Sequence, residues 1–440
     1  MTNTDINSSK SHRILGMNTL AFTISFMVWL MFGILITFLT KPIVVDSVLY
    51  ADGFMPQLKG WTFLIISIPI LTGSLFRLPI GILTDKYGGR PVYTIVLLIS
   101  SVGAFSVAYV DTVAGFIIAG LIFGLAGTSF AVGIAYSSVW FSKEKQGLAL
   151  GIFGAGNAGA ALTSLLAPQL LGQLVGISGT VEQQVGGVLL NVPVVANPAL
   201  WTRLPMVYAC IIFITAIAFF FMTTNKISNA SKTLAERLKP LKNIQVWRFG
   251  IYYFLLFGGF VALSLTLPNY YVEVYGLSLK NAGYLVCIFA LLSAGFRAVG
   301  GWLTDRYGAR SVMYATLLCT ILLCAILCVK VTLPLFAVLT CLIGIVMGIG
   351  MAAVYKHIPN YFPGEVPVVG AMVGVIGGVG GFILPNLFKK TLELTGNYNS
   401  CWMLLTALSA ISLVWMTVAI RGIKTKEKQS EITAPEQQII

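Results

Sequence analysis

The sequence has 440 residues, of which 57% are hydrophobic and only 10% are charged. This composition excludes an ordinary soluble domain, in which about a quarter of the residues are charged. The formal net charge is +13, and its meaning depends on where the lysines and arginines fall relative to the apolar segments.

Apolar runs that can cross about 30 Å of hydrocarbon as helices recur along the whole chain. We predict twelve spans, and the polar residues 1–16 precede the first of them. The predicted spans are 17–40, 60–84, 91–110, 113–141, 147–173, 201–223, 248–272, 279–304, 311–330, 333–357, 367–391 and 399–421. The first run is too long for the core of a signal peptide, so we expect this helix to be retained.

A basic stretch, NKISNASKTLAERLKPLKNIQV, separates the sixth span from the seventh. We therefore expect five regions along the chain. They are a tail at 1–16, a six-helix half at 17–224, a linker at 225–246, a second six-helix half at 247–421 and a tail at 422–440.

Most basic residues fall in the two tails, the linker and the connections on the same side of the membrane. They include Lys10, Arg13, Lys86, Arg90, Lys143, Lys145, Lys226, Lys232, Arg237, Lys239, Lys242, Arg306, Arg310 and Lys424. Because lysine and arginine are retained on the cytoplasmic side, both termini are predicted to be cytoplasmic, in the inner membrane of the cell. The charge then reflects topology and contact with anionic lipid head groups, and no nucleic-acid partner is expected.

One motif occurs twice in the chain, as FRLPIGILTDKYGGR at 76–90 and as FRAVGGWLTDRYGAR at 296–310. We call it the repeated motif. Nine of the fifteen residues are identical. The copies run from the ends of the second and the eighth predicted spans into the connections that follow them, so the two halves run in the same direction through the membrane. The predicted fold is an all-α membrane protein whose twelve transmembrane helices form two parallel-repeat halves of six.

Each copy carries an arginine, Arg77 or Arg297, inside an apolar stretch eight residues before its aspartate. At 1.5 Å per residue, each arginine lies about 12 Å from the cytoplasmic end of its helix. A charge at this depth costs several kcal/mol, yet by the predicted spans every acidic residue falls in a loop, a tail or a helix end.

Two interpretations fit these arginines. They could snorkel or bond backbone carbonyls in a packed interface. Alternatively, they face each other across a central site and bind a small flat oxyanion, which a permanently charged planar fork of donors suits. We favour the anion site.

Titratable and metal-binding groups are scarce inside the spans. The two histidines are His12 in the first tail and His357 at the end of the tenth span, which favours anion exchange over proton symport. The seven cysteines show no metal-ligand spacing. We expect no metal site, no cofactor and no enzymatic activity, because the spans hold no paired carboxylates and no Ser/His arrangement.

Two glycine-rich stretches occupy spans five and eleven, GLALGIFGAGNAG at 147–159 and GAMVGVIGGVGG at 370–381. Glycines at shared offsets of 0, 4 and 7 lie on one helix face, where two backbones can approach closely. The predicted helix-packing glycines are Gly147, Gly151, Gly154, Gly156, Gly159, Gly370, Gly374, Gly377, Gly378, Gly380 and Gly381.

GILTDKYGGR and GWLTDRYGAR resemble the loop signature of the major facilitator superfamily, and the likeness covers nearly the whole chain. With the paired arginines, the two glycine stretches resemble the nitrate/nitrite porter family. The resemblance implies alternating access, with nitrate and nitrite bound between Arg77 and Arg297, and we expect antiport.

The resemblance also implies roles for single residues. It places Asn157, Tyr253, Phe257 and Phe130 at the substrate site; an interhelical hydrogen bond for Asn157, and lipid or core packing for the rings, remain alternatives. It further implies that four charged residues at helix ends lock the halves in the outward-facing state, where turn capping is the alternative. These gating residues are Asp85, Arg90, Asp305 and Arg310.

The expected partners are nitrate, nitrite and membrane lipids, and the expected assembly is a monomer. Three other functions remain open: a proton-coupled nitrate symporter, a carrier of another small anion, and a nitrate sensor that does not transport. Short tails argue against the sensor, because a sensor needs a signalling domain.

Overall fold

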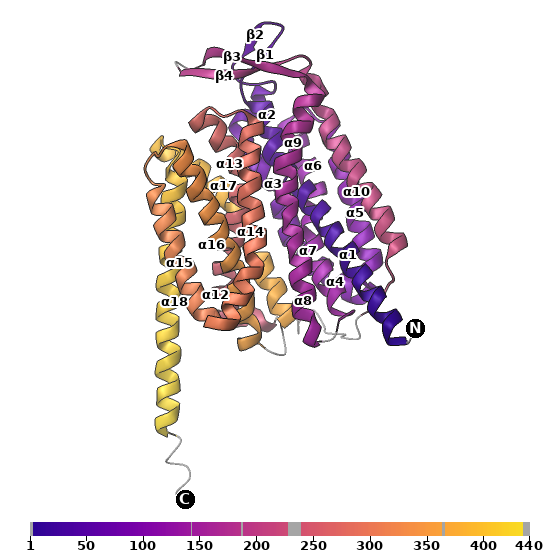
Figure 1. Ribbon diagram of the computed structural model, residues 1–440, viewed down its shortest axis with the longest axis vertical. Coiled ribbons are helices and arrows are strands. Elements are labelled where there is room, and N and C mark those ends of the chain that lie inside the picture. The colour runs from indigo at the N-terminus through magenta and orange to yellow at the C-terminus, as the bar shows by residue number, and fades with distance from the viewer. Residues whose placement is uncertain (1–2, 142, 186–187, 228–238, 363–365, 434–440) are drawn as a thin grey trace, which may run out of the picture.

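The computed structural model describes residues 3–141, 143–185, 188–227, 239–362 and 366–433. Over these residues, twelve helical segments are long and apolar enough to cross a membrane, as predicted. The helices run side by side along the long axis of the molecule (Figure 1). The protein is therefore an all-α membrane protein that passes through the bilayer many times.

The first half is built from segments that break within several of the spans. Its elements are α1 (Asn3–Trp29), α2 (Met31–Thr40), β1 (Ile43–Val45), β2 (Val48–Tyr50), η1 (Pro56–Trp61), α3 (Thr62–Leu75), α4 (Arg77–Tyr87), α5 (Gly89–Ser106), η2 (Val107–Tyr109), α6 (Val113–Phe123), η3 (Gly124–Thr128), α7 (Ser129–Ser138), α8 (Lys143–Gly154), η4 (Ala155–Ala158), α9 (Gly159–Val175), β3 (Ile177–Val185), β4 (Val188–Val195), η5 (Pro198–Thr202) and α10 (Arg203–Met222).

The second half has longer unbroken helices. Its elements are η6 (Lys239–Lys242), α12 (Ile244–Tyr253), the π-helical turn η7 (Phe254–Gly258), α13 (Gly259–Tyr275), α14 (Leu279–Tyr307), α15 (Ala309–Ile326), α16 (Leu333–Tyr361), α17 (Val366–Thr395) and α18 (Ser400–Thr433).

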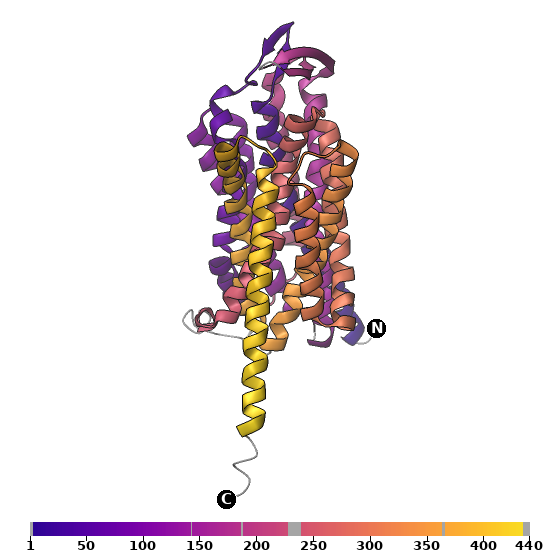
Figure 2. The same ribbon diagram turned by 90° about the vertical axis from the view of Figure 1, so that its left-hand side faces the viewer.

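Helices extend into three regions that the sequence assigned to tails and linker. Helix α1 begins at Asn3 inside the predicted first tail, α12 begins at Ile244 inside the predicted linker, and α18 continues to Thr433 inside the predicted second tail. Figure 2 shows α18 reaching well past the other helices. Hydropathy marks the apolar part of a helix, whereas polar residues continue the same helix beyond it.

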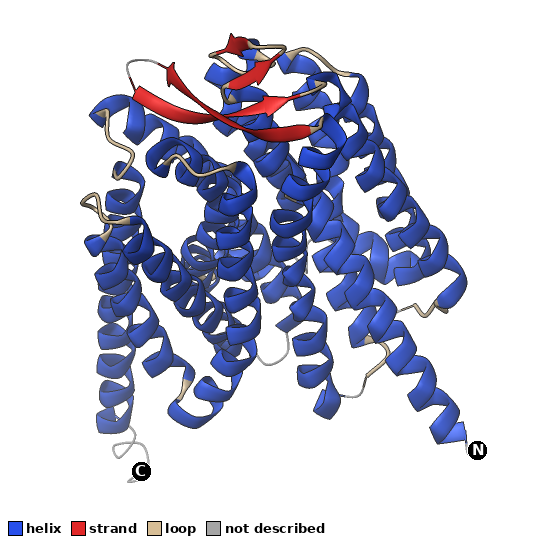
Figure 3. Ribbon diagram, turned by 45° about the horizontal axis from the view of Figure 1, so that its top comes forward, coloured by secondary structure: helices blue, strands red, loops and turns tan. Residues whose placement is uncertain are grey.

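A small sheet, which the sequence analysis did not predict, covers one end of the first half. Its strand order is β2-β1-β4-β3, with β1 and β4 parallel and the two hairpins antiparallel. Figure 3 shows these strands crossing the end of the helices that lies opposite the chain termini. We call this end the sheet end and the opposite one the terminal end.

The most extensive contacts between the two halves involve three pairs of elements. Helix α2 packs against α13, α3 against α17, and α9 against α14. A Cβ on Gly33 would lie 3.2 Å from the Leu265 Cα, and a Cβ on Gly283 would lie 2.3 Å from the Ser164 carbonyl oxygen. These glycines let the backbones of the two halves approach closely.

In both copies of the repeated motif, the helix is followed by a glycine with positive φ. Gly88 follows α4 with a φ of 88°, and Gly308 follows α14 with a φ of 79°. The two sites differ in their surroundings, because a Cβ on Gly88 would lie 2.1 Å from the Asn225 Oδ1, whereas nothing lies within 4 Å at Gly308. Asn225 also donates to the Tyr87 carbonyl at 2.9 Å.

Because of this difference, Gly88→Ala and Gly308→Ala can be compared as a matched pair of variants. We expect Gly308→Ala to cost about 1–3 kcal/mol of stability from backbone strain alone. Gly88→Ala should cost more, since it also displaces Asn225 from the end of α4. Thermal unfolding of the purified variants in one detergent would measure both. Equal losses would show that the Asn225 contact does not matter.

Candidate functional site

Arg77 is the first residue of α4 and lies directly after the break at Phe76. Its side chain is only 1% exposed. The Nη1 atom donates to the Gly374 carbonyl at 2.6 Å and the Nε atom to the Gly127 carbonyl at 3.2 Å. Since Gly374 belongs to the second half, Arg77 itself joins the halves.

Aromatic rings surround the Arg77 guanidinium. Its Cζ lies 5.6 Å from the ring centroid of Trp29, 5.2 Å from that of Phe130 and 5.4 Å from that of Phe257. Carbonyl dipoles and ring faces thus stabilise this charge where a carboxylate is the usual partner. The packed-interface interpretation is correct for these contacts, although it leaves the positive charge uncompensated.

Arg297 lies on α14 in the second half and is partly buried. Its Nη2 atom donates to the Tyr253 hydroxyl at 3.2 Å, and its Cζ lies 5.9 Å from the Tyr355 ring centroid. The Nη1 atom is buried and has no hydrogen-bond partner in the described part of the chain. A buried N–H group of this kind is costly until an acceptor meets it.

Aromatic side chains bridge the two arginines. The rings of Tyr253 and Phe257 stack with their centroids 5.0 Å apart and an interplanar angle of 2°. Phe257 lies beside Arg77 and Tyr253 bonds Arg297, so this pair spans the distance between the guanidinium groups. The π-helical turn η7 follows Tyr253 directly and contains Phe257, and such turns often mark functional sites.

Tyr355 on α16 belongs to the same cluster and was not predicted. Its ring meets Tyr253 edge to face at 5.0 Å and Phe130 at 6.4 Å, and its hydroxyl donates to the Gly370 carbonyl at 3.1 Å. No motif or repeat in the sequence distinguishes it from other aromatic residues of the spans. Only the packing of α16 against the rings brings it to the site.

Asn157 lies in η4 and is 1% exposed. Neither its Oδ1 nor its Nδ2 has a hydrogen-bond partner among the described residues, so the alternative of an interhelical hydrogen bond is wrong in this conformation. The η4 turn packs against α14, which carries Arg297. Ser74 shows a similar pattern near Arg77: its buried Oγ also lacks a partner, and it was not predicted.

The glycine stretches behave differently in the two halves. A Cβ on Gly377 would lie 2.2 Å from the Tyr253 ring, and a Cβ on Gly378 would lie 2.3 Å from the Ser74 Oγ. Glycines at 156, 159, 380 and 381 are packed as closely, and those at 370 and 374 touch Tyr355. Packing contacts of Gly147 lie outside what the structure describes.

At Gly151 and Gly154 the packing prediction is wrong for this conformation, because a Cβ there would meet nothing within 4 Å. Gly151 and Gly154 belong to α8, whereas Gly156 lies in η4 and Gly159 begins α9. The glycines at offsets 4 and 7 of the first copy, Gly151 and Gly154, therefore face open space. Those at the same offsets of the second copy, Gly374 and Gly377, contact the aromatic cluster.

The predicted gating residues lie at the terminal end. Arg90 donates to the Phe220 carbonyl at 2.8 Å, Arg310 donates to the Tyr361 hydroxyl at 2.8 Å, and Asp305 pairs with Lys356. Each of these contacts stays within one half, and Asp85 lies two residues before the end of α4. Among the described residues, the contacts of Arg90, Asp305 and Arg310 therefore do not join the halves in this conformation.

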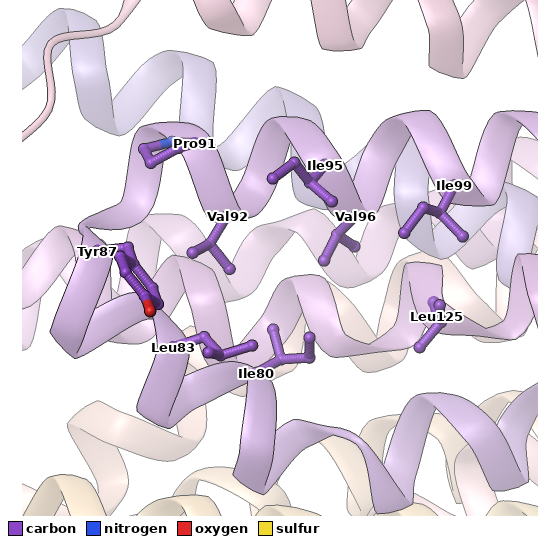
Figure 4. A pocket seen from close by; sticks show the side chains of 9 residues that line it. All are labelled: Ile80, Leu83, Tyr87, Pro91, Val92, Ile95, Val96, Ile99 and Leu125. Carbon is purple, nitrogen blue, oxygen red and sulfur yellow. The ribbon is translucent and has the colours of Figure 1, made fainter.

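A groove of about 470 Å³ lies on the first half, and neither Arg77 nor Arg297 is among its lining residues (Figure 4). Its lining is apolar and comes from α4, α5 and η3. The lining residues are Ile80, Leu83, Tyr87, Pro91, Val92, Ile95, Val96, Ile99 and Leu125. Such a lining suits the acyl chains of lipids and does not suit an anion.

The model of the Major Facilitator Superfamily matches this chain over residues 17–385 and again over 249–439. The chain belongs to the major facilitator superfamily. This membership confirms the predicted fold of two six-helix halves, and it identifies a transporter and not an enzyme.

Curated relatives carry names related to nitrate and nitrite. The chain is 39% identical over 306 residues to the "Probable nitrate/nitrite antiporter NarK1" of Thermus thermophilus, covering 69% of this chain and 63% of that protein. It is 28% identical over 298 residues to the "Nitrite extrusion protein" of Bacillus subtilis, covering 68% of this chain and 66% of that protein. The matches thus span about two thirds of these relatives.

Solved structures share the fold at low sequence identity. A bacterial homologue of the human lysosomal transporter Spinster, in an inward-facing and occupied conformation, matches with a TM-score of 0.68 and 14% identity over 94% of this chain and 97% of that one. The nucleoside transporter NupG matches with a TM-score of 0.63 and 16% identity over 91% of this chain and 99% of that one.

The glycine asymmetry gives a second matched pair. Gly377→Ala should reduce stability by about 1–3 kcal/mol, because its Cβ must displace the Tyr253 ring. Gly154 is the counterpart of Gly377 in the first glycine stretch, and a Cβ added there faces open space. Gly154→Ala should therefore leave stability unchanged or raise it by up to about 1 kcal/mol. Thermal unfolding compares them, and a larger loss for Gly154→Ala would contradict the packing.

Proposed function

We propose that this protein is a nitrate/nitrite transporter that works by alternating access, with antiport as its mode. One observation carries the proposal. Arg77 and Arg297, one from each half, are connected through stacked aromatic rings, and their described contacts are carbonyls, a hydroxyl and rings in place of carboxylates. The names of the relatives from Thermus thermophilus and Bacillus subtilis agree with this proposal.

The unsatisfied donors suit a small planar oxyanion. The Nη1 of Arg297 and the Nδ2 of Asn157 are buried donors that have no hydrogen-bond partner among the described residues. An oxyanion can accept hydrogen bonds from both, and its charge offsets the repulsion between the two guanidinium groups, which lie within electrostatic range of each other. The flat rings of Tyr253 and Phe257 limit the site to a thin ligand.

Antiport follows from the same charges. Arg77 is already buried, and Arg297 also loses access to water when the halves close over the site. Two uncompensated cations in a low-dielectric interior resist that step. A bound anion removes much of this cost. The carrier therefore changes sides readily only when loaded, which makes one anion exchange for another.

We further propose that the terminal end faces the cytoplasm of a cell with this protein in its inner membrane. Its basic residues support this orientation, because lysine and arginine are retained on that side. The protein is proposed to act as a monomer, since each chain holds both arginines and both halves, and its apolar flanks contact lipid.

Lysine cannot replace either arginine in this site. Arg77→Lys and Arg297→Lys should each lower nitrate/nitrite exchange by about ten- to a hundredfold, because one charge-assisted contact worth about 1.5–3 kcal/mol is lost with the planar fork. The measurement is uptake of labelled nitrate into proteoliposomes loaded with nitrite.

Arg306→Lys is the matched control for these variants. Arg306 lies in the second copy of the repeated motif and aligns with Lys86 of the first copy. Its guanidinium contacts the Trp302 and Tyr307 rings at the end of the helix. It should exchange at the normal rate. Near-normal exchange by both Arg77→Lys and Arg297→Lys would exclude the proposed site.

The mode of transport has its own test in the same vesicles. Uptake of external nitrate should require nitrite or nitrate inside and should not respond to an imposed pH gradient. Uptake into anion-free vesicles, driven by external acid, would instead establish proton symport and would contradict antiport.

A further inference from the structure

A polar cluster at the sheet end joins the halves and takes no part in the arginine site. Lys41, which ends α2 in the first half, forms an ion pair with Glu273 near the end of α13 in the second half. The side chains are 15% and 26% exposed. The Tyr398 hydroxyl donates to the other carboxylate oxygen of Glu273.

Glu273 is a carboxylate that the sequence assigned only to a helix end. Because Tyr398 holds one oxygen and Lys41 the other, both oxygens have partners on different elements. Burial lowers the pKa of Lys41 to about 7, and the charge of Lys59 is the second cause. Burial thus disfavours the charged form of Lys41, and the contact with the Glu273 carboxylate opposes this effect.

Weaker contacts between the halves surround this pair. The Asn386 Nδ2 donates to the Ser67 Oγ at 2.9 Å, and the Lys389 Nζ donates to the Gly60 carbonyl at 2.5 Å. Both bonds connect α17 with the second span, at Ser67 in α3 and at Gly60 in η1. The sheet end is therefore closed by several polar contacts. Among the residues that the structure describes, the ion pair of Lys41 with Glu273 is the one that joins opposite charges from the two halves.

A small cavity lies just inside this closure. Phe63 lines it from the first half, and the second half contributes Thr266, Asn269, Tyr270, Phe388, Leu392, Tyr398 and Cys401. Tyr270 precedes Glu273 by one turn of α13, so Glu273 lies on the sheet side of the cavity. Tyr398 both lines the cavity and bonds Glu273.

We propose that Lys41, Glu273 and Tyr398 form an ionic latch that keeps the sheet end closed and that must break before the central site opens to that side. The inference rests on the alternating access proposed above and not on the identity of the anion. Opening the sheet end separates Lys41 from Glu273, because they belong to different halves. The latch therefore sets the equilibrium between the state that is closed at the sheet end and the state that is open there.

Native Cys401 is a reporter for this balance. It is 8% exposed and lines the cavity behind the latch. In a background in which the other six cysteines are replaced, a membrane-impermeant maleimide added from the sheet side labels Cys401 only when that end opens. Glu273→Gln should raise the labelling rate about three- to tenfold, as loss of a partly buried ion pair shifts a two-state equilibrium.

Asp52→Asn is the matched control. It removes one carboxylate from the same end of the protein, where Asp52 pairs with Lys59 at 2.6 Å, but both residues are exposed and both belong to the first half. This variant should label at the unchanged rate. Equal rates for Glu273→Gln, Asp52→Asn and the parent protein would overturn the latch.

Exchanging the charges of Lys41 and Glu273 distinguishes an ionic latch from a general loosening of the sheet end. Lys41→Glu combined with Glu273→Lys should restore slow labelling, whereas Lys41→Glu alone should label fast because two carboxylates then face each other. Fast labelling by the double variant would show that the pair acts through local packing and would also overturn the proposal.

Labelling needs no substrate, so the two proposals fail separately. If the parent protein exchanges no nitrate but Glu273→Gln still accelerates labelling, the latch stands and the anion assignment fails. If nitrate exchange is normal and labelling is unaffected by Glu273→Gln, the assignment stands and the latch fails.

Discussion

The buried charge of Arg77 is the constraint on which the rest of the centre depends. Its guanidinium is nearly inaccessible to solvent and bonds the carbonyls of Gly127 and Gly374. A carboxylate there would neutralise the arginine permanently and remove the reason to bind an anion. Carbonyl dipoles and ring faces hold the side chain in place while leaving its net charge for a ligand.

The irregular backbone around Arg77 serves this arrangement. The second span breaks at Phe76 directly before the arginine, and the seventh span forms a π-helical turn directly after Tyr253. The small residues of α17 bring its carbonyls to the arginine, since a Cβ on Gly378 would lie 3.2 Å from the Arg77 Nη1. Glycine thus acts at this site by letting a backbone oxygen replace a side chain as the ligand of the charge.

The two ends of the molecule are joined in different ways. At the terminal end, Arg90 and Arg310 bond partners within their own halves, whereas Lys41 and Glu273 connect one half with the other at the sheet end. The glycine face at positions 151 and 154 is likewise unpacked, while its counterpart in the second half is filled by aromatic rings. A parallel repeat in sequence therefore does not give equal contacts in one conformational state.

The sequence by itself determined the number of spans, the parallel repeat and the depth of both arginines, because hydropathy, repeated residues and helical rise are local properties. It also indicated Tyr253 and Phe257 through the family resemblance. Only the tertiary structure decided the partners: Tyr355, Ser74 and the pairing of Lys41 with Glu273 come from segments far apart in the chain. The joining of the two hairpins into one sheet was likewise decided by the tertiary structure, since β1 and β4 pair across more than a hundred residues.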